Sequence, residues 1–339
     1  MMPPPGLSPN GMPGEPDDAL VQVRNLHVRF VSKDATVHAV NGVDFDLGTG
    51  EVLCILGESG SGKSVTLRSM MRLHPPRTTV LSGAIRVAGH DILAISDRRL
   101  SEIRGSIVSM IFQEPMTSLD PVFTLGTQIA EVIVRHEGTS RATARRRALE
   151  LLDLVQIPSA RQRLAAYPHE LSGGLRQRAM IAIALACRPK VLLADEPTTA
   201  LDATVQIQIL LLLRHLQQQM GMGMIFVTHD LGVASEIADR IAVMYAGRFV
   251  EQGPVDALMR APLHPYTQGL LGATVHDGMR GKRLFTIPGA PPDLEFLPPG
   301  CSFAPRCSRA SAECLNDPPH WRHPAPGRIA RCVRVQDAA

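Results

Sequence analysis

The chain has 339 residues, and 35 Lys and Arg against 32 Asp and Glu leave a formal net charge of +3. This near-neutral balance argues against a nucleic-acid-binding stripe as the organising feature, and we expect no nucleic-acid partner. With 45% hydrophobic and 20% charged residues, the composition is globular and excludes disorder throughout. Aromatic residues make up only 4%, which disfavours an all-β architecture and favours helices packed on a sheet.

The N-terminal stretch 1–19 is rich in Pro and Gly and lacks both a basic start and an apolar middle. It predicts a disordered lead-in and not a secretory signal. No apolar run approaches the roughly 20 residues that a membrane-spanning helix needs. The six cysteines are too few for a disulfide scaffold, and we expect them to be reduced. Cys54 and Cys187 lie in apolar segments and are predicted to be small buried side chains.

Short apolar runs alternate with helical patterns along most of the chain. Strand-like alternation begins near Ala19 and resumes at His38, before a buried strand predicted at 52–56 and a glycine loop that leads into a helix. Further apolar runs predict strands at 107–112, 191–195, 224–228 and 241–245. We therefore expect an α/β sheet covered by helices on both faces.

Two segments depart from this pattern. Amphipathic helices are predicted between Gly126 and Val155, within a helical subdomain of about 115–175. After Ala261, Pro, Gly and Cys replace the hydrophobic periodicity. The sequence thus predicts a core domain over 20–260 and a small loop-rich extension over 261–339.

The segment GESGSGKS matches the pattern G-x-x-x-x-G-K-[ST], and it lies between a predicted strand and a predicted helix, as this motif requires. Its glycines let backbone N–H groups converge on phosphate oxygens, while Lys63 reaches the β- and γ-phosphates and the Ser64 hydroxyl ligates Mg²⁺. We expect it to bind ATP with Mg²⁺. The predicted nucleotide-binding residues of this phosphate loop are Gly57, Glu58, Ser59, Gly60, Ser61, Gly62, Lys63, Ser64 and Val65.

Two adjacent carboxylates end the predicted strand at 191–195. Asp195 suits the Mg²⁺ shell, and Glu196 suits polarising the attacking water or accepting its proton. A second glycine-rich helix start, LSGGLRQ at 171–177, is explained either by a helix N-cap or by a second phosphate contact.

The strings GESGSGKS, LSGG, LLADEP, ALD and THD, with Gln113 after the first of them, follow the order of the ATP-binding subunits of ABC transporters. The chain resembles this family over about 20–250, which implies a P-loop NTPase fold and ATP hydrolysis. It also implies that two such domains pack head to tail around the nucleotide.

The resemblance assigns roles to further residues. Ser172, Gly173 and Gly174 would serve ATP bound mainly by the partner domain. Gln113 would sense Mg²⁺ and the attacking water, and His229 would hold the γ-phosphate. Asp202 would link the two sites. Phe30 lies where the family places an aromatic ring against adenine, although a strand-end core role also explains it.

Longer strings, FQEPMTSLDPVFTLGTQI from Phe112 and HPYTQGLL from His264, resemble the peptide and nickel importer subfamily, and IPGAPPDLEFLPPGC resembles its oligopeptide and dipeptide ATPases. Small departures are Leu175 in place of Met, and Ser302 and Ser308 in place of Pro. The subfamily implies two transmembrane permease subunits, a second ATPase chain that differs from this one, and an extracytoplasmic binding protein. It places the chain peripherally on the cytoplasmic face of the inner membrane. Nickel or another small solute stays open as the cargo.

Four cysteines crowd the C-terminal end with the spacing C-x5-C-x6-C-x17-C, which is not a paired zinc-ribbon arrangement. Four thiolates could enclose a 4Fe-4S cluster. Subfamily members with similarly placed cysteines carry such a cluster, and this resemblance favours iron for Cys301, Cys307, Cys314 and Cys332. Zinc, unliganded thiols and mixed ligation with His320 and His323 stay open.

Two other classes of function are alternatives to transport. A soluble ABC-type ATPase would normally carry two cassettes or a long coiled-coil insertion, and neither is found in the sequence. Alternatively, the cysteine-containing extension would be a redox- or metal-sensing module that uses ATP.

Overall fold

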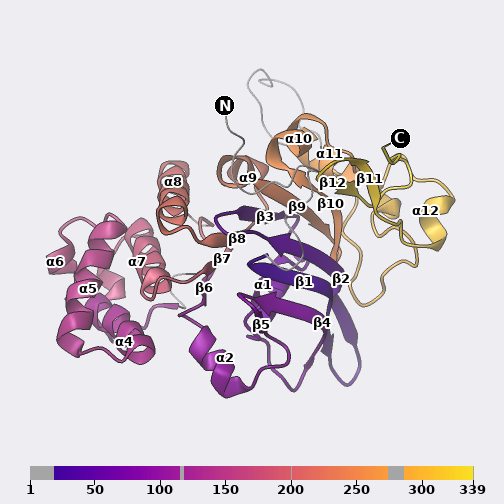
Figure 1. Ribbon diagram of the computed structural model, residues 1–339. Helices are drawn as coiled ribbons and strands as arrows, with labels where there is room; N and C mark the ends of the chain where they lie inside the picture. Colours follow the sequence, from indigo (N-terminus) through magenta and orange to yellow (C-terminus); the bar gives the residue numbers. More distant parts are fainter. Residues whose placement is uncertain (1–18, 115–117, 200, 274–285, 339) are drawn as a thin grey trace. The chain divides into compact units, whose positions relative to one another are not determined.

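The computed structural model describes residues 19–114, 118–199, 201–273 and 286–338 (Figure 1). The predicted lead-in therefore lies outside the described residues, apart from Ala19. Contacts divide the chain into a first unit (Met1–Gly48, Val52–Leu93 and Val227–Ala339) and a second unit (Thr49–Glu51 and Ala94–Phe226). Within the described ranges, no helix combines the length and the apolarity needed to cross a bilayer.

One sheet of the first unit is antiparallel, with strand order β2-β1-β4-β5 (Figure 1). Alternate residues of β1, such as Val21 and Val23, are buried, as the sequence pattern predicts. The sequence analysis missed β4, because Gly83 interrupts its alternation where the strand closely approaches the backbone of Asn25. The strands are β1 Val21–Val31, β2 Thr36–Leu47, β4 Thr79–Val87 and β5 His90–Asp91.

Five further strands of the first unit belong to one sheet and follow one another in the order β11-β12-β10-β9-β3. β3 runs parallel to β9, and all five residues of β3 are buried, which confirms the strand predicted at 52–56. β12 pairs antiparallel with β10, so part of the predicted loop-rich extension forms an edge of this sheet. The strands are β3 Val52–Leu56, β9 Arg240–Tyr245, β10 Arg248–Pro254, β11 Arg322–Ala325 and β12 Arg328–Ala330.

Short helices flank the strands of the first unit. α1 packs against β1 and β2, α9 packs against β3, and α10 packs against both α9 and β10. The helices are α1 Lys63–Ser69, α9 Leu231–Ile237, α10 Val255–Arg260, α11 Pro265–Gly272, α12 Glu313–Asn316 and the 3-10 turn η2 Ala304–Arg306.

The second unit contains three buried strands in the order β8-β7-β6, and β6 and β7 are parallel. The last two residues of β8, Val227 and Thr228, are assigned to the first unit. The three strands confirm those predicted from the apolar runs at 107–112, 191–195 and 224–228. Helices α4, α5 and α7 pack on one another, in magenta in Figure 1, and α7 packs on β6. The strands are β6 Val108–Ile111, β7 Val191–Asp195 and β8 Gly223–Thr228.

Side-chain caps fix where the helices of the second unit begin. Thr124 caps α4 and Ser140 caps α5, and each side chain accepts from the backbone N–H three residues later. α4 and α5 confirm the helical insert predicted between Gly126 and Val155. The helices are α2 Asp97–Ile103, α4 Leu125–Glu137, α5 Arg141–Leu154, α6 Ala160–Arg163, η1 Pro168–Glu170, α7 Gly173–Leu185 and α8 Ala203–Met220.

Candidate functional site

The phosphate loop joins β3 to α1 and lies against the backbone of the first unit. A Cβ on Gly57 would lie 2.2 Å from the carbonyl oxygen of Met244. A Cβ on Gly62, whose φ is +104°, would lie 2.4 Å from the carbonyl oxygen of Ala39. Both positions therefore require glycine, and the motif places the loop backbone where a side chain cannot intrude.

Lys63 is a buried cation at the start of α1. Its Nζ donates to the carbonyl oxygens of Gly57 at 2.8 Å and Glu58 at 2.9 Å, so the side chain folds back into the loop. Among the described residues, the buried hydroxyl oxygen of Ser61 finds no hydrogen-bond partner. A buried ammonium and a buried hydroxyl are costly unless polar groups satisfy them. The loop thus fits a ligand rich in negatively charged oxygens, such as a polyphosphate with its Mg²⁺.

Two residues of the C-terminal extension contact the same loop, and the sequence analysis missed both. The Glu58 amide donates to the Tyr266 hydroxyl at 2.9 Å, and the Glu58 carboxylate accepts two hydrogen bonds from Arg306, at 2.7 and 3.1 Å. Arg306 is 248 residues from Glu58 in sequence, so no local pattern links them.

Phe30 lies half-buried in β1. Its ring centroid is 5.4 Å from that of His74, at 78°, and Nε2 of His74 lies 3.0 Å from the carbonyl oxygen of Val65. Burial lowers the pKa of His74 below its usual value. The Phe30 ring thus packs beside the helix that follows the phosphate loop, and its predicted contact with adenine stays a prediction.

His229 follows β8 and is exposed. The next residue, Asp230, caps α9, because its carboxylate accepts from the amides of Gly232 at 2.8 Å and Val233 at 3.3 Å. The cap fixes the turn that carries His229, so its position is set by the junction of β8 and α9.

In the second unit, the two adjacent carboxylates stand at the end of β7 and differ in exposure. Asp195 is fully buried, whereas Glu196 is partly exposed. Glu196 has φ +46°, a left-handed conformation that residues other than glycine rarely adopt. Its Oε2 accepts a hydrogen bond from the Thr199 hydroxyl at 3.0 Å, a partner that the sequence analysis missed. Backbone and hydroxyl together orient the Glu196 side chain.

The LSGG segment opens α7. Ser172 caps this helix by accepting from the Leu175 amide at 3.4 Å, which confirms the helix-cap alternative. Ser172 and Gly173 are exposed, and the second phosphate contact stays a prediction. Asp202 caps α8 in the same way, accepting from the Val205 amide at 3.0 Å.

The predicted site residues fall into two sets, one in each unit. The first unit contains Phe30, the phosphate loop at 57–65 and His229. The second unit contains Gln113, which is exposed after β6, together with Ser172, Gly173, Gly174, Asp195, Glu196 and Asp202.

The four C-terminal cysteines line one cavity in the first unit, together with His264, Phe303, Arg309 and Arg334 among others. Burial raises the thiol pKa of Cys301 and Cys332, and electrostatic interaction with neighbouring cysteines raises it further. The convergence of four residues spread over 301–332 is a property of the fold that their spacing did not reveal.

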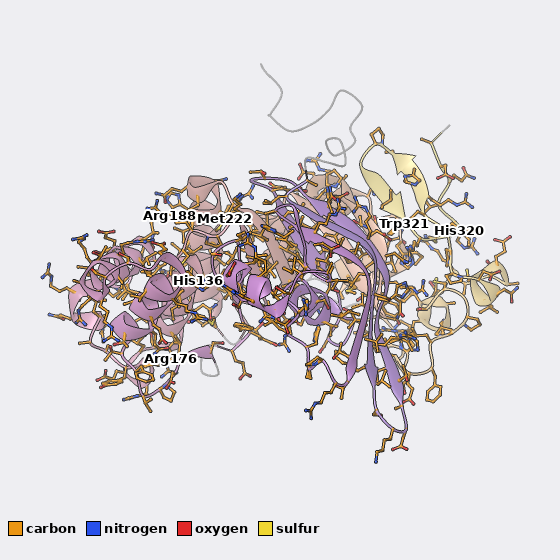
Figure 2. The ribbon with its side chains drawn as sticks, turned by 60° about the horizontal axis from the view of Figure 1, so that its bottom comes forward. His136, Arg176, Arg188, Met222, His320 and Trp321 are labelled. Carbon is orange, nitrogen blue, oxygen red and sulfur yellow. The ribbon has the colours of Figure 1, made fainter. Side chains whose placement is uncertain are left out.

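No group of three or more His, Cys, Asp or Glu side chains in the described ranges is close enough to hold a metal ion. This finding supports neither a zinc ion nor the expected 4Fe-4S cluster at these cysteines, and the cluster stays a prediction. His320 and His323 are exposed and do not line the cysteine cavity, and Figure 2 shows His320 beside Trp321 in the C-terminal segment.

All six cysteines lie in the described residues and none forms a disulfide. Cys54 is fully buried, as predicted. The prediction for Cys187 was wrong, because this residue is only half-buried. It follows the end of α7 and precedes Arg188, whose positive φ turns the chain away from the helix.

Comparison with known proteins identifies the family. A sequence profile described as ABC transporter matches residues 40–199, and one described as oligopeptide/dipeptide transporter, C-terminal region, matches residues 250–314. A relative from Brucella abortus (strain 2308), which carries the name of a peptide import ATP-binding protein, is 50% identical over 313 residues, which are 92% of this chain and 94% of that protein. The chain belongs to the ATP-binding subunits of ABC transporters.

Other comparisons agree with this assignment of the ABC ATPase. A relative of the same kind from Brucella melitensis biotype 1 is 49% identical over 332 residues, covering 94% of this chain and 98% of that protein. A solved ATP-binding cassette, a dimer in a post-hydrolysis state bound to ADP and Pi, has a TM-score of 0.62 and 29% identity over 69% of this chain and 98% of its own. CbiO1 from Clostridium perfringens, part of an ABC transporter complex, has a TM-score of 0.62 and 28% identity over 72% of this chain and 92% of its own. The expected P-loop NTPase fold and the expected ATP hydrolysis are thereby confirmed.

Proposed function

We propose that this ABC ATPase energises the import of oligopeptides or dipeptides. The observation that carries the proposal is the oligopeptide/dipeptide transporter region at 250–314 in the same chain as the ATP-binding cassette. The naming of the Brucella relatives for peptide import supports the same cargo. The chain would act peripherally, on the cytoplasmic face of the membrane.

Within the cassette, we assign binding of the ATP phosphates to the loop at 57–65. Lys63 would exchange its bonds to the Gly57 and Glu58 carbonyls for the β- and γ-phosphates. Ser64 and Asp195 would hold Mg²⁺, with Gln113 at the same ion, and bound Mg²⁺ would neutralise charge on the phosphates. Phe30 would stack on the base.

For hydrolysis, Glu196 would accept the proton of the attacking water, in the orientation set by its backbone and by Thr199. Gln113 would orient that water, and His229 would bind the γ-phosphate. Ser172, Gly173 and Gly174 of this chain would contact ATP held by a second ATPase chain, with Asp202 between the sites. The exposure of Ser172 and Gly173 is compatible with such a contact.

The assembly would contain two transmembrane permease subunits, an extracytoplasmic binding protein and a second, different ATPase chain. Copurification of the permeases and the second ATPase with this chain tests the assembly. The cargo is tested by ATP hydrolysis in the reconstituted complex with its binding protein. Stimulation by peptides supports the proposal, whereas stimulation by Ni²⁺ and not by peptides would replace it with a nickel importer.

We also assign a 4Fe-4S cluster to Cys301, Cys307, Cys314 and Cys332. Cysteine thiolates are the usual protein ligands of iron–sulfur clusters, and these four cysteines line one cavity. The resemblance to subfamily members with similarly placed cysteines favours iron over zinc. Arg309 and Arg334, which also line the cavity, would offset the negative charge of the thiolates.

A further inference from the structure

Glu58 is the second residue of the phosphate loop, and it is held at each of its polar groups. Its carbonyl oxygen accepts from Lys63 Nζ at 2.9 Å, and its amide donates to the Tyr266 hydroxyl at 2.9 Å. Its carboxylate oxygens accept from the two terminal nitrogens of Arg306 at 2.7 and 3.1 Å. The amide and the side chain of Glu58 are thus held by residues outside the loop, and its carbonyl oxygen is held by Lys63 within the loop.

Arg306 is itself a rigid anchor. Its side chain is 5% exposed, its Nε donates to the Pro288 carbonyl oxygen at 2.9 Å, and Nη1 donates to the Tyr245 hydroxyl at 3.3 Å. The hydrogen bond to Glu58 is the main cause that raises the pKa of Arg306 above its usual value. Arginine presents a planar fork that matches a carboxylate at two points, so the pair fixes direction as well as charge.

Tyr266 is equally constrained. It is fully buried, and its ring packs 4.6 Å from that of Tyr245 and 5.4 Å from that of Phe303, measured between centroids. The side chain of His264, two residues earlier, caps the same helix by accepting from the Tyr266 amide at 3.1 Å. The hydroxyl that accepts from the Glu58 amide therefore belongs to a buried ring packed between two other aromatic rings.

The negative charge of Glu58 explains why contacts that hold this residue are needed. Glu58 places a carboxylate in a loop that must receive a polyphosphate, and two negative groups at close range repel each other. The Arg306 guanidinium neutralises this carboxylate and ties it toward the C-terminal extension. Because Lys63 bonds to the Glu58 carbonyl, a shift of Glu58 would also move the lysine.

We propose that Arg306 and Tyr266 are positioning residues for ATP binding. They hold Glu58 so that the phosphate loop is preformed, and they act without touching the nucleotide. The inference rests on the proposed assignment of ATP to this loop. It predicts that the C-terminal extension sets the affinity of the chain for ATP through Glu58, separately from any effect on the hydrolytic step.

The first test is Arg306→Gln in the full chain, with binding of a fluorescent ATP analogue and Mg²⁺ measured beside KM and kcat. We expect Kd and KM to rise about tenfold while kcat per bound ATP stays within about twofold, because preorganisation is lost and chemistry is not. Arg306→Lys should restore part of the affinity, since it keeps the charge and loses the fork. Arg322→Gln is the matched control, because Arg322 forms an exposed ion pair with Asp337 in the same unit.

The second test is a double-mutant cycle with Glu58→Gln. If Arg306 acts through Glu58, adding Arg306→Gln to Glu58→Gln changes Kd by less than about twofold, whereas two independent effects would multiply. Tyr266→Phe removes one hydroxyl and should weaken ATP binding in the same direction. This variant carries the test if Arg306→Gln does not fold.

Either of two results would overturn the inference. In the first, the Arg306→Gln and Tyr266→Phe variants bind ATP with the Kd of the parent. In the second, the changes in Kd caused by Arg306→Gln and Glu58→Gln multiply in the double variant. The assignment of ATP to the loop is tested separately by Lys63→Ala, which should abolish binding. If Lys63→Ala binds ATP normally, the loop assignment fails, and the inference fails with it.

Discussion

Glu196 follows the last residue of β7 in a left-handed backbone conformation, which costs a residue with a Cβ about 1–3 kcal/mol. The surrounding fold maintains this conformation, and the Thr199 hydroxyl bonds to the carboxylate at 3.0 Å. The strain is therefore stored at one of the two adjacent carboxylates, the one that is partly exposed and able to meet a water molecule.

Glu196→Gln should bind ATP with unchanged affinity and lose turnover by at least about a hundredfold, because an amide cannot accept the proton of the attacking water. Turnover is measured as phosphate release and binding with a fluorescent ATP analogue. Thr199→Val should lower kcat less and leave Kd unchanged, since it removes only the orienting hydroxyl. Normal turnover of Glu196→Gln would refute the assignment of the base.

His264 gives the folded chain a specific sensitivity to acid. Burial lowers its pKa to about 3, whereas the unfolded chain titrates near the ordinary value of 6.5. Its neutral Nδ1 accepts from the Tyr266 amide, and the buried Glu251 carboxylate accepts from the His264 amide at 2.9 Å. Between these two pKa values the unfolded state binds more protons, so protonation favours unfolding.

For this residue alone, the free energy of unfolding should not change with pH above about 6.5. It should fall by about 1.4 kcal/mol for each pH unit between there and the folded pKa of about 3. His264→Asn keeps a side chain that can cap α11 and should remove this part of the slope. Urea unfolding of parent and variant, followed by circular dichroism across that range, measures the difference. His320→Asn, at an exposed histidine, is the control, and equal slopes for parent and His264→Asn would contradict the prediction.

At the scale of elements, the junction of β3, the phosphate loop and α1 depends on glycines that meet neighbouring strands. Gly62 and Gly50 both have positive φ, but only Gly62 has a backbone atom where its Cβ would stand. Gly62→Ala should weaken ATP binding by more than about tenfold, because the loop must shift away from Ala39. Gly50→Ala should cost about 1–2 kcal/mol in backbone strain and leave ATP binding unchanged. Equal binding by both variants would show that the close approach is not needed.

The elements that the sequence predicted well are those with a local signal. The buried runs at 52–56 and 191–195 coincide with β3 and β7, because a continuous apolar run bounded by polar turns needs no partner to be recognised. β12 escaped prediction, because its three residues become a strand only by pairing with β10, for example Ala330 with Glu251. The carboxylate pair and the glycine loop were found from spacing, whereas Thr199 and Arg306 depend on tertiary contacts that spacing does not contain.

At the scale of the whole molecule, contacts join the described part of the C-terminal extension to the phosphate loop. Both lie in the first unit. In the extension β12 pairs with β10, and Arg306 forms hydrogen bonds with Glu58 of the loop. The loss of hydrophobic periodicity after Ala261 predicts where the extension begins, but not what it touches. Pairs separated by more than two hundred residues are set by the fold and leave no periodic trace.

The cysteine cavity lies in the same unit and gives a prediction for the purified protein. Anaerobically purified parent should contain iron and sulfide and absorb visible light, and the double substitution of Cys301 and Cys307 by Ser should remove all three, because two ligands of the cluster are lost. Cys187→Ala is the control, since Cys187 is not among the residues that line the cavity. A colourless parent that contains no iron would refute the cluster.

The pairing of Glu58 with Arg306 has a consequence for how such chains can be recombined. If the C-terminal extension were replaced by one that lacks an arginine at position 306, the Glu58 carboxylate in the phosphate loop would lose its compensating charge. If the extension kept Arg306 and the loop lacked Glu58, a buried guanidinium would be left without its ion-pair partner. Chimeras built from this chain should therefore exchange Glu58 and Arg306 together.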